Sequence, residues 1–95
     1  MTPRSIGPMQ LRVLLFLAER PDSTMTEMAE EFDCHLEQVC LVLTRLCARK
    51  MARREVRRSP KRISFFLTHE GREELHRWAV WFKKLPNYLA RVAAE

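Results

Sequence analysis

The fold of this chain is decided by the stretch Met51-Ala-Arg-Arg-Glu-Val-Arg-Arg-Ser-Pro-Lys-Arg-Ile-Ser-Phe-Phe-Leu-Thr-His-Glu-Gly71. It predicts a β-hairpin, because two short arms rich in Val, Ile, Phe and Thr flank the turn-forming pair Ser59-Pro60. Four cations surround that turn: Arg57, Arg58, Lys61 and Arg62. The hairpin is therefore expected to project as a positively charged finger.

The second arm of this hairpin alternates in the way that a half-buried strand does. Ile63, Phe65 and Leu67 are expected on a buried face, and Ser64 and Phe66 on a solvated one, because side chains along a strand point to opposite faces in turn.

Length and charge limit the class of protein. With 95 residues, of which 46% are hydrophobic, the chain is expected to form one globular domain over residues 1–95. Residues 1–48 carry four Arg and seven acids, whereas residues 49–95 carry thirteen Lys or Arg and five acids. The net charge of +5 is thus concentrated in the second half. This asymmetry predicts a basic face for a polyanionic partner.

The sequence also predicts a cytoplasmic protein without a membrane partner. No apolar run approaches the roughly 20 residues that span a bilayer, and the amino terminus lacks the regions of a signal peptide. The three cysteines include no Cys-x-x-Cys pair, which favours a reducing compartment over a disulfide framework.

The first helix is expected to follow a loose arm at residues 1–7. Pro8 suits its first turn and Pro21 ends it after Arg20. One apolar stripe consists of Leu11, Leu14, Leu15 and Ala18. Further apolar residues leave few polar positions elsewhere, so we expect this helix to be covered on more than one side.

Two more helices are predicted before the hairpin. Thr24 and Glu27 match a capping box at the start of a helix from Met25 to Phe32. The next helix runs from about Leu36 to Arg49, with core candidates Val39, Val42, Leu43 and Leu46. Such a helix pair occurs both in helix-turn-helix proteins and in plain bundles, but the basic hairpin directly afterwards makes the first interpretation more specific.

Three segments of this chain resemble winged helix-turn-helix transcription regulators of the MarR-like and PadR-like branches. Residues 24–32 look like the second helix of that family, residues 39–51 like its recognition helix and exit, and residues 66–72 like its wing-to-helix signature. The resemblance covers roughly residues 8–85. It implies an α+β, mainly α fold: a three-helix core, a two- or three-stranded β wing and a C-terminal helix.

The resemblance also implies where double-stranded DNA would be contacted. Helix 36–49 would enter the major groove, and the basic wing 53–63 would lie on the backbone or in the minor groove, as in a repressor. The groove-facing positions would be Leu36, Glu37, Gln38, Cys40, Leu41, Thr44 and Arg45. The wing positions would be Arg53, Arg54, Arg57, Arg58, Lys61 and Arg62.

The chain departs from the family pattern in two respects. Lys50 stands where the family usually has Gly, so the left-handed end of the helix must be made differently or at some strain. The groove-facing set is also poor in base readers, because only Gln38 and Arg45 can make bidentate contacts to adenine or guanine.

The last third predicts one helix from His69 or Glu70 to Leu85, a break at Pro86, and a shorter helix from Asn87 to Glu95. The Thr68 hydroxyl is expected to cap the first of these. Apolar residues form a heptad-like seam, which either closes the domain's own core or joins two subunits into a homodimer. The predicted dimer interface comprises Leu75, Trp78, Trp81, Phe82, Leu85, Tyr88, Leu89 and Val92.

No catalytic residue, cofactor or metal site is predicted. Cys40 and Cys47 share a helix face, but seven residues at a rise of about 1.5 Å place them about 10 Å apart, too far for one zinc ion. Two hypotheses of different classes remain. One is a DNA-binding transcription regulator, and the other is a winged-helix module that binds a protein through Leu36, Cys40 and Leu41.

Overall fold

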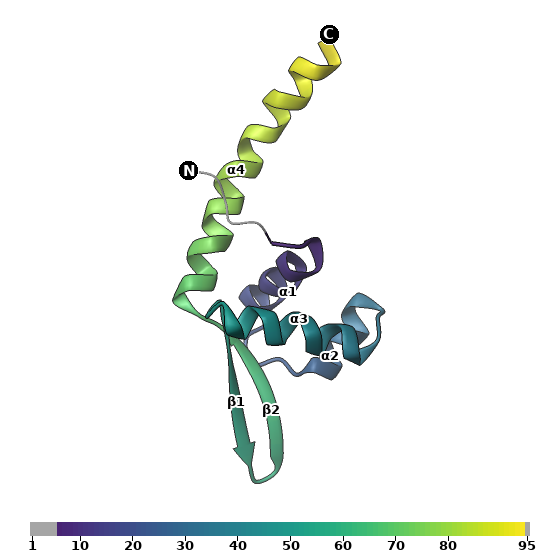
Figure 1. Ribbon diagram of the computed structural model, residues 1–95, viewed down its shortest axis with the longest axis vertical. Helices are drawn as coiled ribbons and strands as arrows, with labels where there is room; N and C mark the ends of the chain where they lie inside the picture. Colours follow the sequence, from purple (N-terminus) through teal and green to yellow (C-terminus); the bar gives the residue numbers. More distant parts are fainter. Residues whose placement is uncertain (1–5, 95) are drawn as a thin grey trace.

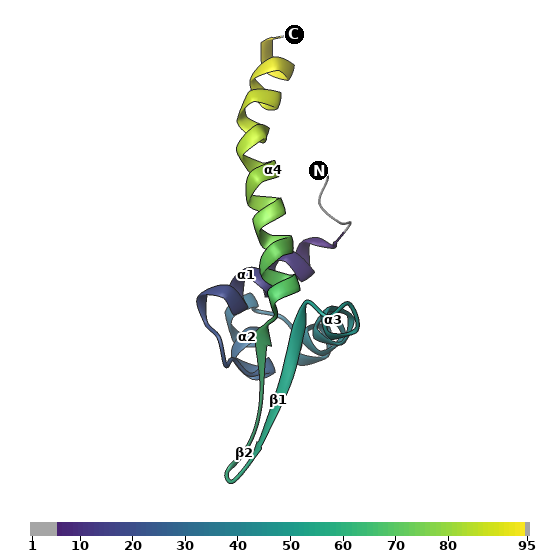
Figure 2. The same cartoon turned by 90° about the vertical axis from the view of Figure 1, so that its left-hand side faces the viewer.

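In the computed structural model, the described backbone covers residues 6–94 and the described side chains cover residues 6–81. The elements in chain order are α1 (Pro8–Glu19), α2 (Met25–Phe32), α3 (Leu36–Ala48), β1 (Ala52–Arg58), β2 (Lys61–Leu67) and α4 (His69–Ala94). Helices α1, α2 and α3 form a body from which the hairpin and α4 project in opposite directions (Figure 1, Figure 2). The loose arm predicted for residues 1–7 lies outside the described residues except for its last two.

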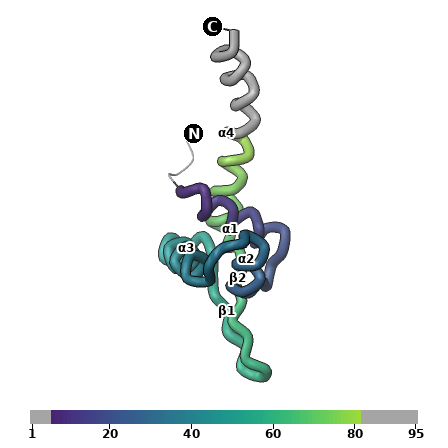
Figure 3. Tube along the Cα trace, turned by 90° about the vertical axis from the view of Figure 1, so that its right-hand side faces the viewer, coloured from purple at the N-terminus to yellow at the C-terminus, as the bar shows by residue number. Residues whose placement is uncertain are grey.

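The core lies where α1, α2 and α3 meet the base of the hairpin (Figure 3). All four core candidates of the third helix are buried, which confirms that part of the sequence prediction. The buried apolar residues are Val13, Leu14, Phe16, Leu17, Met28, Val39, Val42, Leu43, Leu46, Met51, Ala52, Phe65 and Leu67. Burying these side chains is the main stabilising contribution to the domain.

The buried face of α1 differs from the predicted stripe. Val13 and Leu17 are buried with Leu14, whereas Leu15 is 49% exposed and Ala18 faces solvent. The reason is that α1 contacts α3, β2 and α4 together, so its buried face is displaced from the stripe read off the sequence. The expectation that several elements cover this helix is confirmed.

Helix α3 ends in a left-handed residue despite the missing glycine. Lys50 has a φ of 61°, and its amide donates to the Cys47 carbonyl at 3.0 Å. The Met51 amide donates to the Leu46 carbonyl at 2.9 Å, which completes the pair of hydrogen bonds typical of a Schellman helix end. The structure therefore uses a lysine in a conformation that favours glycine.

The wing is a two-stranded antiparallel hairpin. Its register pairs Ala52 with Leu67 at the base and Arg58 with Lys61 beside the turn. One isolated bridge, in which the Phe65 amide donates to the Ser23 carbonyl at 2.8 Å, joins the hairpin to the loop before α2. This single bridge takes the place of a third strand.

The predicted division of the second strand into a buried face and a solvent-exposed face is wrong at Ser64. Phe65 and Leu67 are buried as predicted, but Ser64 is also fully buried. The loop that contains Asp22 and Ser23 packs across this part of the hairpin and closes the face that the alternation assigned to solvent.

Helix α4 begins as predicted. The Thr68 hydroxyl accepts from the Gly71 amide at 3.0 Å and donates to the Lys50 carbonyl at 2.6 Å, so it caps α4 and ties it to the end of α3. The predicted break at Pro86 is wrong, because α4 continues to Ala94. A proline removes one amide donor and crowds one turn, and here the helix continues in spite of that cost.

Candidate nucleic-acid interface

The outward face of α3 carries the seven predicted groove-facing residues, and all seven are exposed. Leu36 and Leu41 are 47% and 52% exposed, so this face of α3 is partly apolar. The Thr44 hydroxyl donates to the Cys40 carbonyl at 2.8 Å. Its proton is thus used within the helix, and only the acceptor capacity of its oxygen is left for a partner.

The six wing cations are divided between two faces of the hairpin. Residues two apart on a strand share a face, and the register brings the matching faces of β1 and β2 together. The open face consists of Arg54, Val56, Arg58, Lys61 and Ile63. The paired face consists of Arg53, Glu55, Arg57, Arg62, Ser64 and Phe66.

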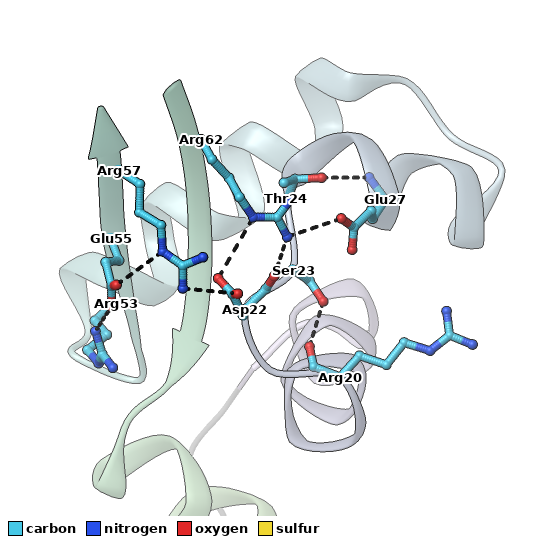
Figure 4. A network of polar contacts seen from close by, with 9 residues as sticks. All are labelled: Arg20, Asp22, Ser23, Thr24, Glu27, Arg53, Glu55, Arg57 and Arg62. Atoms are coloured by element: carbon cyan, nitrogen blue, oxygen red, sulfur yellow. Dashed lines mark hydrogen bonds and ion pairs between the residues drawn. The ribbon is translucent and has the colours of Figure 1, made fainter. Parts of the chain in front are cut away.

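Every cation of the paired face has a carboxylate partner (Figure 4). Arg53 contacts Glu55 at 3.1 Å, and its guanidinium lies 4.3 Å from the centre of the Phe66 ring. Arg57 contacts Glu55 at 3.7 Å and Asp22 at 3.1 Å. Together with the Arg62 contacts described next, they pair three arginines with carboxylates of the same domain.

Arg62 connects the paired face to the start of α2. It donates to the Asp22 carbonyl at 2.7 Å and contacts the Glu27 carboxylate at 3.4 Å. The Thr24 hydroxyl accepts from the Glu27 amide at 3.2 Å, as the predicted capping box requires. The Glu27 carboxylate, however, contacts the wing instead of completing the box, which is a correction to the sequence prediction.

Asp22 is the acid around which the paired face is arranged. The Ser64 hydroxyl, Arg57 and Arg62 lower the pKa of Asp22, and desolvation opposes them. Ser64 Oγ and Asp22 Oδ1 are both buried, and neither atom has another hydrogen-bond partner in the described part of the chain.

The contacts that Asp22 and Glu27 make with the wing were not predicted from the sequence. Both acids lie at least 35 positions from the arginines they contact, so no local pattern joins them. The only sequence signal is the presence of acids beside the start of a helix in a chain whose later half is strongly basic.

The cations of the open face have no carboxylate partner among residues 6–81. Arg58 and Lys61 are paired across the two strands beside the turn. Val56, which is 43% exposed, lies between Arg54 and Arg58 on the same face of β1. Together with Ile63 these residues line a shallow groove. This side of the hairpin is accordingly both basic and partly apolar.

The open face meets α3 at a cavity of about 280 Å³. Its lining includes Cys40, Thr44 and Cys47 of α3 together with Arg54 and Ile63 of the hairpin. Burial raises the pKa of the Cys47 thiol, and the nearby Arg54 partly offsets that effect. The outward surface of α3 and the open face therefore form one continuous side of the molecule.

The predicted dimer residues are only partly described. Leu75 packs against the core of its own chain. Trp78 and Trp81 stack edge to face with centroids 5.6 Å apart, and Trp81 is 39% exposed. The remaining members fall outside the described side chains: Phe82, Leu85, Tyr88, Leu89 and Val92.

The described residues contain no cluster of three His, Cys, Asp or Glu side chains arranged to hold a metal ion. No described helix combines the length and apolar character needed to cross a membrane.

A helix-turn-helix pair followed by a basic hairpin and a further helix defines a winged helix. Solved structures share this arrangement. An S. aureus MepR mutant bound to an oligodeoxyribonucleotide matches at a TM-score of 0.78 with 19% identity, over 90% of this chain and 64% of that one. Streptococcus pneumoniae FabT in complex with DNA matches at 0.73 with 17% identity, over 92% and 62%.

A MarR-family transcription regulator also matches, at a TM-score of 0.78 with 16% identity, over 88% of this chain and 57% of that one. The chain therefore has the MarR-like winged-helix fold, which confirms the predicted fold class. It spans less than two thirds of the length of these three structures. No family model matches the chain, and no curated protein sequence does.

Proposed function

We propose that this protein is a DNA-binding transcription regulator, a repressor that places α3 in the major groove and the wing on the backbone or in the minor groove. The observation that carries the proposal is the continuous side formed by the outward face of α3 and the cations of the open face. A positively charged projection beside an exposed helix suits a duplex, since phosphate contacts fix position and base-edge contacts select sequence.

The solved neighbours support a duplex as the partner, because two of them were determined with DNA. The proposal needs a binding surface and no catalytic group or cofactor. Gln38 and Arg45 are assigned the base contacts, because their side chains are exposed on α3 and can make two hydrogen bonds to one base.

The proposal includes a homodimer of the single domain. Val80 and Trp81 are 42% and 39% exposed on the part of α4 that leads away from the body. Apolar surface on a projecting helix favours a partner helix, and two-fold symmetry would suit a palindromic operator.

The second candidate is a protein-binding module. Leu36 and Leu41, with the exposed Cys40, form an apolar patch on the same helix face. A protein partner would use this patch and would not require the cations of the open face.

The direct experiment incubates the purified chain with sheared genomic DNA and sequences the retained fragments. An enriched motif, followed by tighter and salt-dependent binding to that duplex than to a shuffled duplex in fluorescence anisotropy, is the expected result. Absence of both enrichment and salt-dependent binding would contradict the proposal and favour the protein-binding candidate.

A further inference from the structure

The basic wing combines two charge environments that its sequence does not separate. The paired face sets Arg53, Arg57 and Arg62 against Glu55, Asp22 and Glu27, so the formal charge of this group is zero. The open face has Arg54, Arg58 and Lys61 with no carboxylate partner among the described residues.

We infer that only the open face supplies the phosphate contacts of the wing, while Arg57 and Arg62 hold the hairpin on the domain and Arg53 is neutralised by Glu55 within the hairpin. This inference rests on the proposed function. It identifies Arg54, Arg58 and Lys61 as the DNA-contacting cations and Asp22 as the principal acid that holds the wing in place.

Geometry favours the open face as the contacting side. It continues from the outward face of α3 across the cavity lined by Thr44 and Arg54, so a duplex seated on α3 reaches these cations first. The paired face instead meets the loop before α2 through Asp22 and the first turn of α2 through Glu27.

Electrostatics favour the same side. A phosphate that approaches Arg57 or Arg62 also approaches Asp22, and a phosphate near Arg53 also approaches Glu55. The carboxylates repel the phosphate and compete for the same guanidinium groups, whereas the open face offers no such competition.

The exposed ion pairs are individually weak, so no single pair fixes the hairpin. Arg53 and Arg57 are about half exposed, and pairs of this kind contribute little in water. The network matters because the Arg57 contact with the Asp22 carboxylate and the Arg62 hydrogen bond to the Asp22 carbonyl converge on one loop. Several joined contacts fix the hairpin better than an isolated pair does.

Strand β1 offers two double variants that are matched in charge, residue type and spacing. Arg54→Ala with Arg58→Ala removes two cations of the open face. Arg53→Ala with Arg57→Ala removes two of the paired face. Each pair is four residues apart on the same strand, so the two variants are matched in residue type, spacing and change of charge.

Fluorescence anisotropy on a duplex enriched from genomic DNA, from 50 to 300 mM salt and below each Tm, separates the roles. We expect the open-face variant to flatten the slope of log affinity against log salt by nearly two and to weaken binding about 30-fold at 0.15 M salt. Its Tm should stay that of the wild type. The paired-face variant should keep the slope and lose about 2–8 °C in Tm.

Equal flattening by both variants would overturn the division of the wing while leaving DNA binding intact. An unchanged slope in the open-face variant would also overturn it. A wild-type chain without salt-dependent duplex binding would instead contradict the proposed function itself, so the two failures are distinguishable.

Discussion

At Lys50 the backbone holds a conformation that glycine adopts more cheaply. Lys50→Gly is expected to raise the free energy of unfolding by about 1 kcal/mol, because relief of the left-handed strain exceeds the extra entropy of an unfolded glycine. Lys50→Ala is the control, since it removes the charge and keeps the Cβ atom. Urea denaturation measures the free energy of unfolding of both variants. Equal stabilisation by the two substitutions would contradict backbone strain at Lys50.

Asp22 is expected to make stability depend on pH in the acid range. Its folded-state pKa lies below the ordinary value of 3.8, so its contribution is complete above that value and is lost as the pH falls through the folded-state pKa. The stability difference between wild type and Asp22→Asn should therefore shrink below about pH 4. Denaturation at a series of acid pH values measures this, and a difference that stays constant would contradict it.

Gln38 and Arg45 are expected to carry the base discrimination of α3. Replacing either with Ala should reduce the preference for the enriched duplex over a shuffled one by about 1–3 kcal/mol, the usual value of a good bidentate contact. Anisotropy on both duplexes measures the preference. Equal losses on the two duplexes would show that α3 does not read bases.

At the scale of elements, the junction between α3, the hairpin and α4 depends on Gly71. A Cβ atom at this position would collide with the Met51 carbonyl oxygen and lie 2.7 Å from Leu67 Cδ1. Gly71→Ala is therefore expected to destabilise the domain by about 1–3 kcal/mol, because backbone on one side of the contact cannot yield easily. The exposed Arg72→Ala in the same turn is the control, and equal Tm values for the two variants would contradict the close approach.

The order and limits of the elements could largely be predicted from local chemistry. Thr24 and Thr68 mark two helix starts, and α2 has the bounds that its cap and apolar face predict. Two of the failures depend on contacts distant in sequence. The burial of Ser64 needs the loop at Asp22, and the Glu27 carboxylate is drawn to Arg62.

The candidate site was predictable as a set of residues but not as an arrangement. Exposure of the seven positions on α3 follows from the period of its four core residues. The division of the wing cations into two groups does not follow from the sequence pattern. Strand alternation predicts two faces, but it does not show which face meets acids from another part of the chain.

At the scale of the whole molecule, a homodimer is expected. Sedimentation at micromolar concentration should give about twice the chain mass of 11.3 kDa. Trp81→Ala should shift the equilibrium toward monomer, since it removes exposed aromatic surface from α4. Leu41→Ala, equally apolar and exposed on α3, should leave the mass unchanged. A wild-type monomer at this concentration would contradict the prediction.

The Thr68 contact with Lys50 gives α4 a mechanical role in such a dimer. Because one hydroxyl ties the start of α4 to the end of α3, a tilt of α4 is expected to carry α3 with it. The 26 residues of α4 extend for about 39 Å, so a tilt of roughly 10° moves the far end by about 7 Å. The same tilt would move the start of α3, about 20 Å from its tied end, by up to about 3 Å, which is close to one base-pair step of about 3.4 Å.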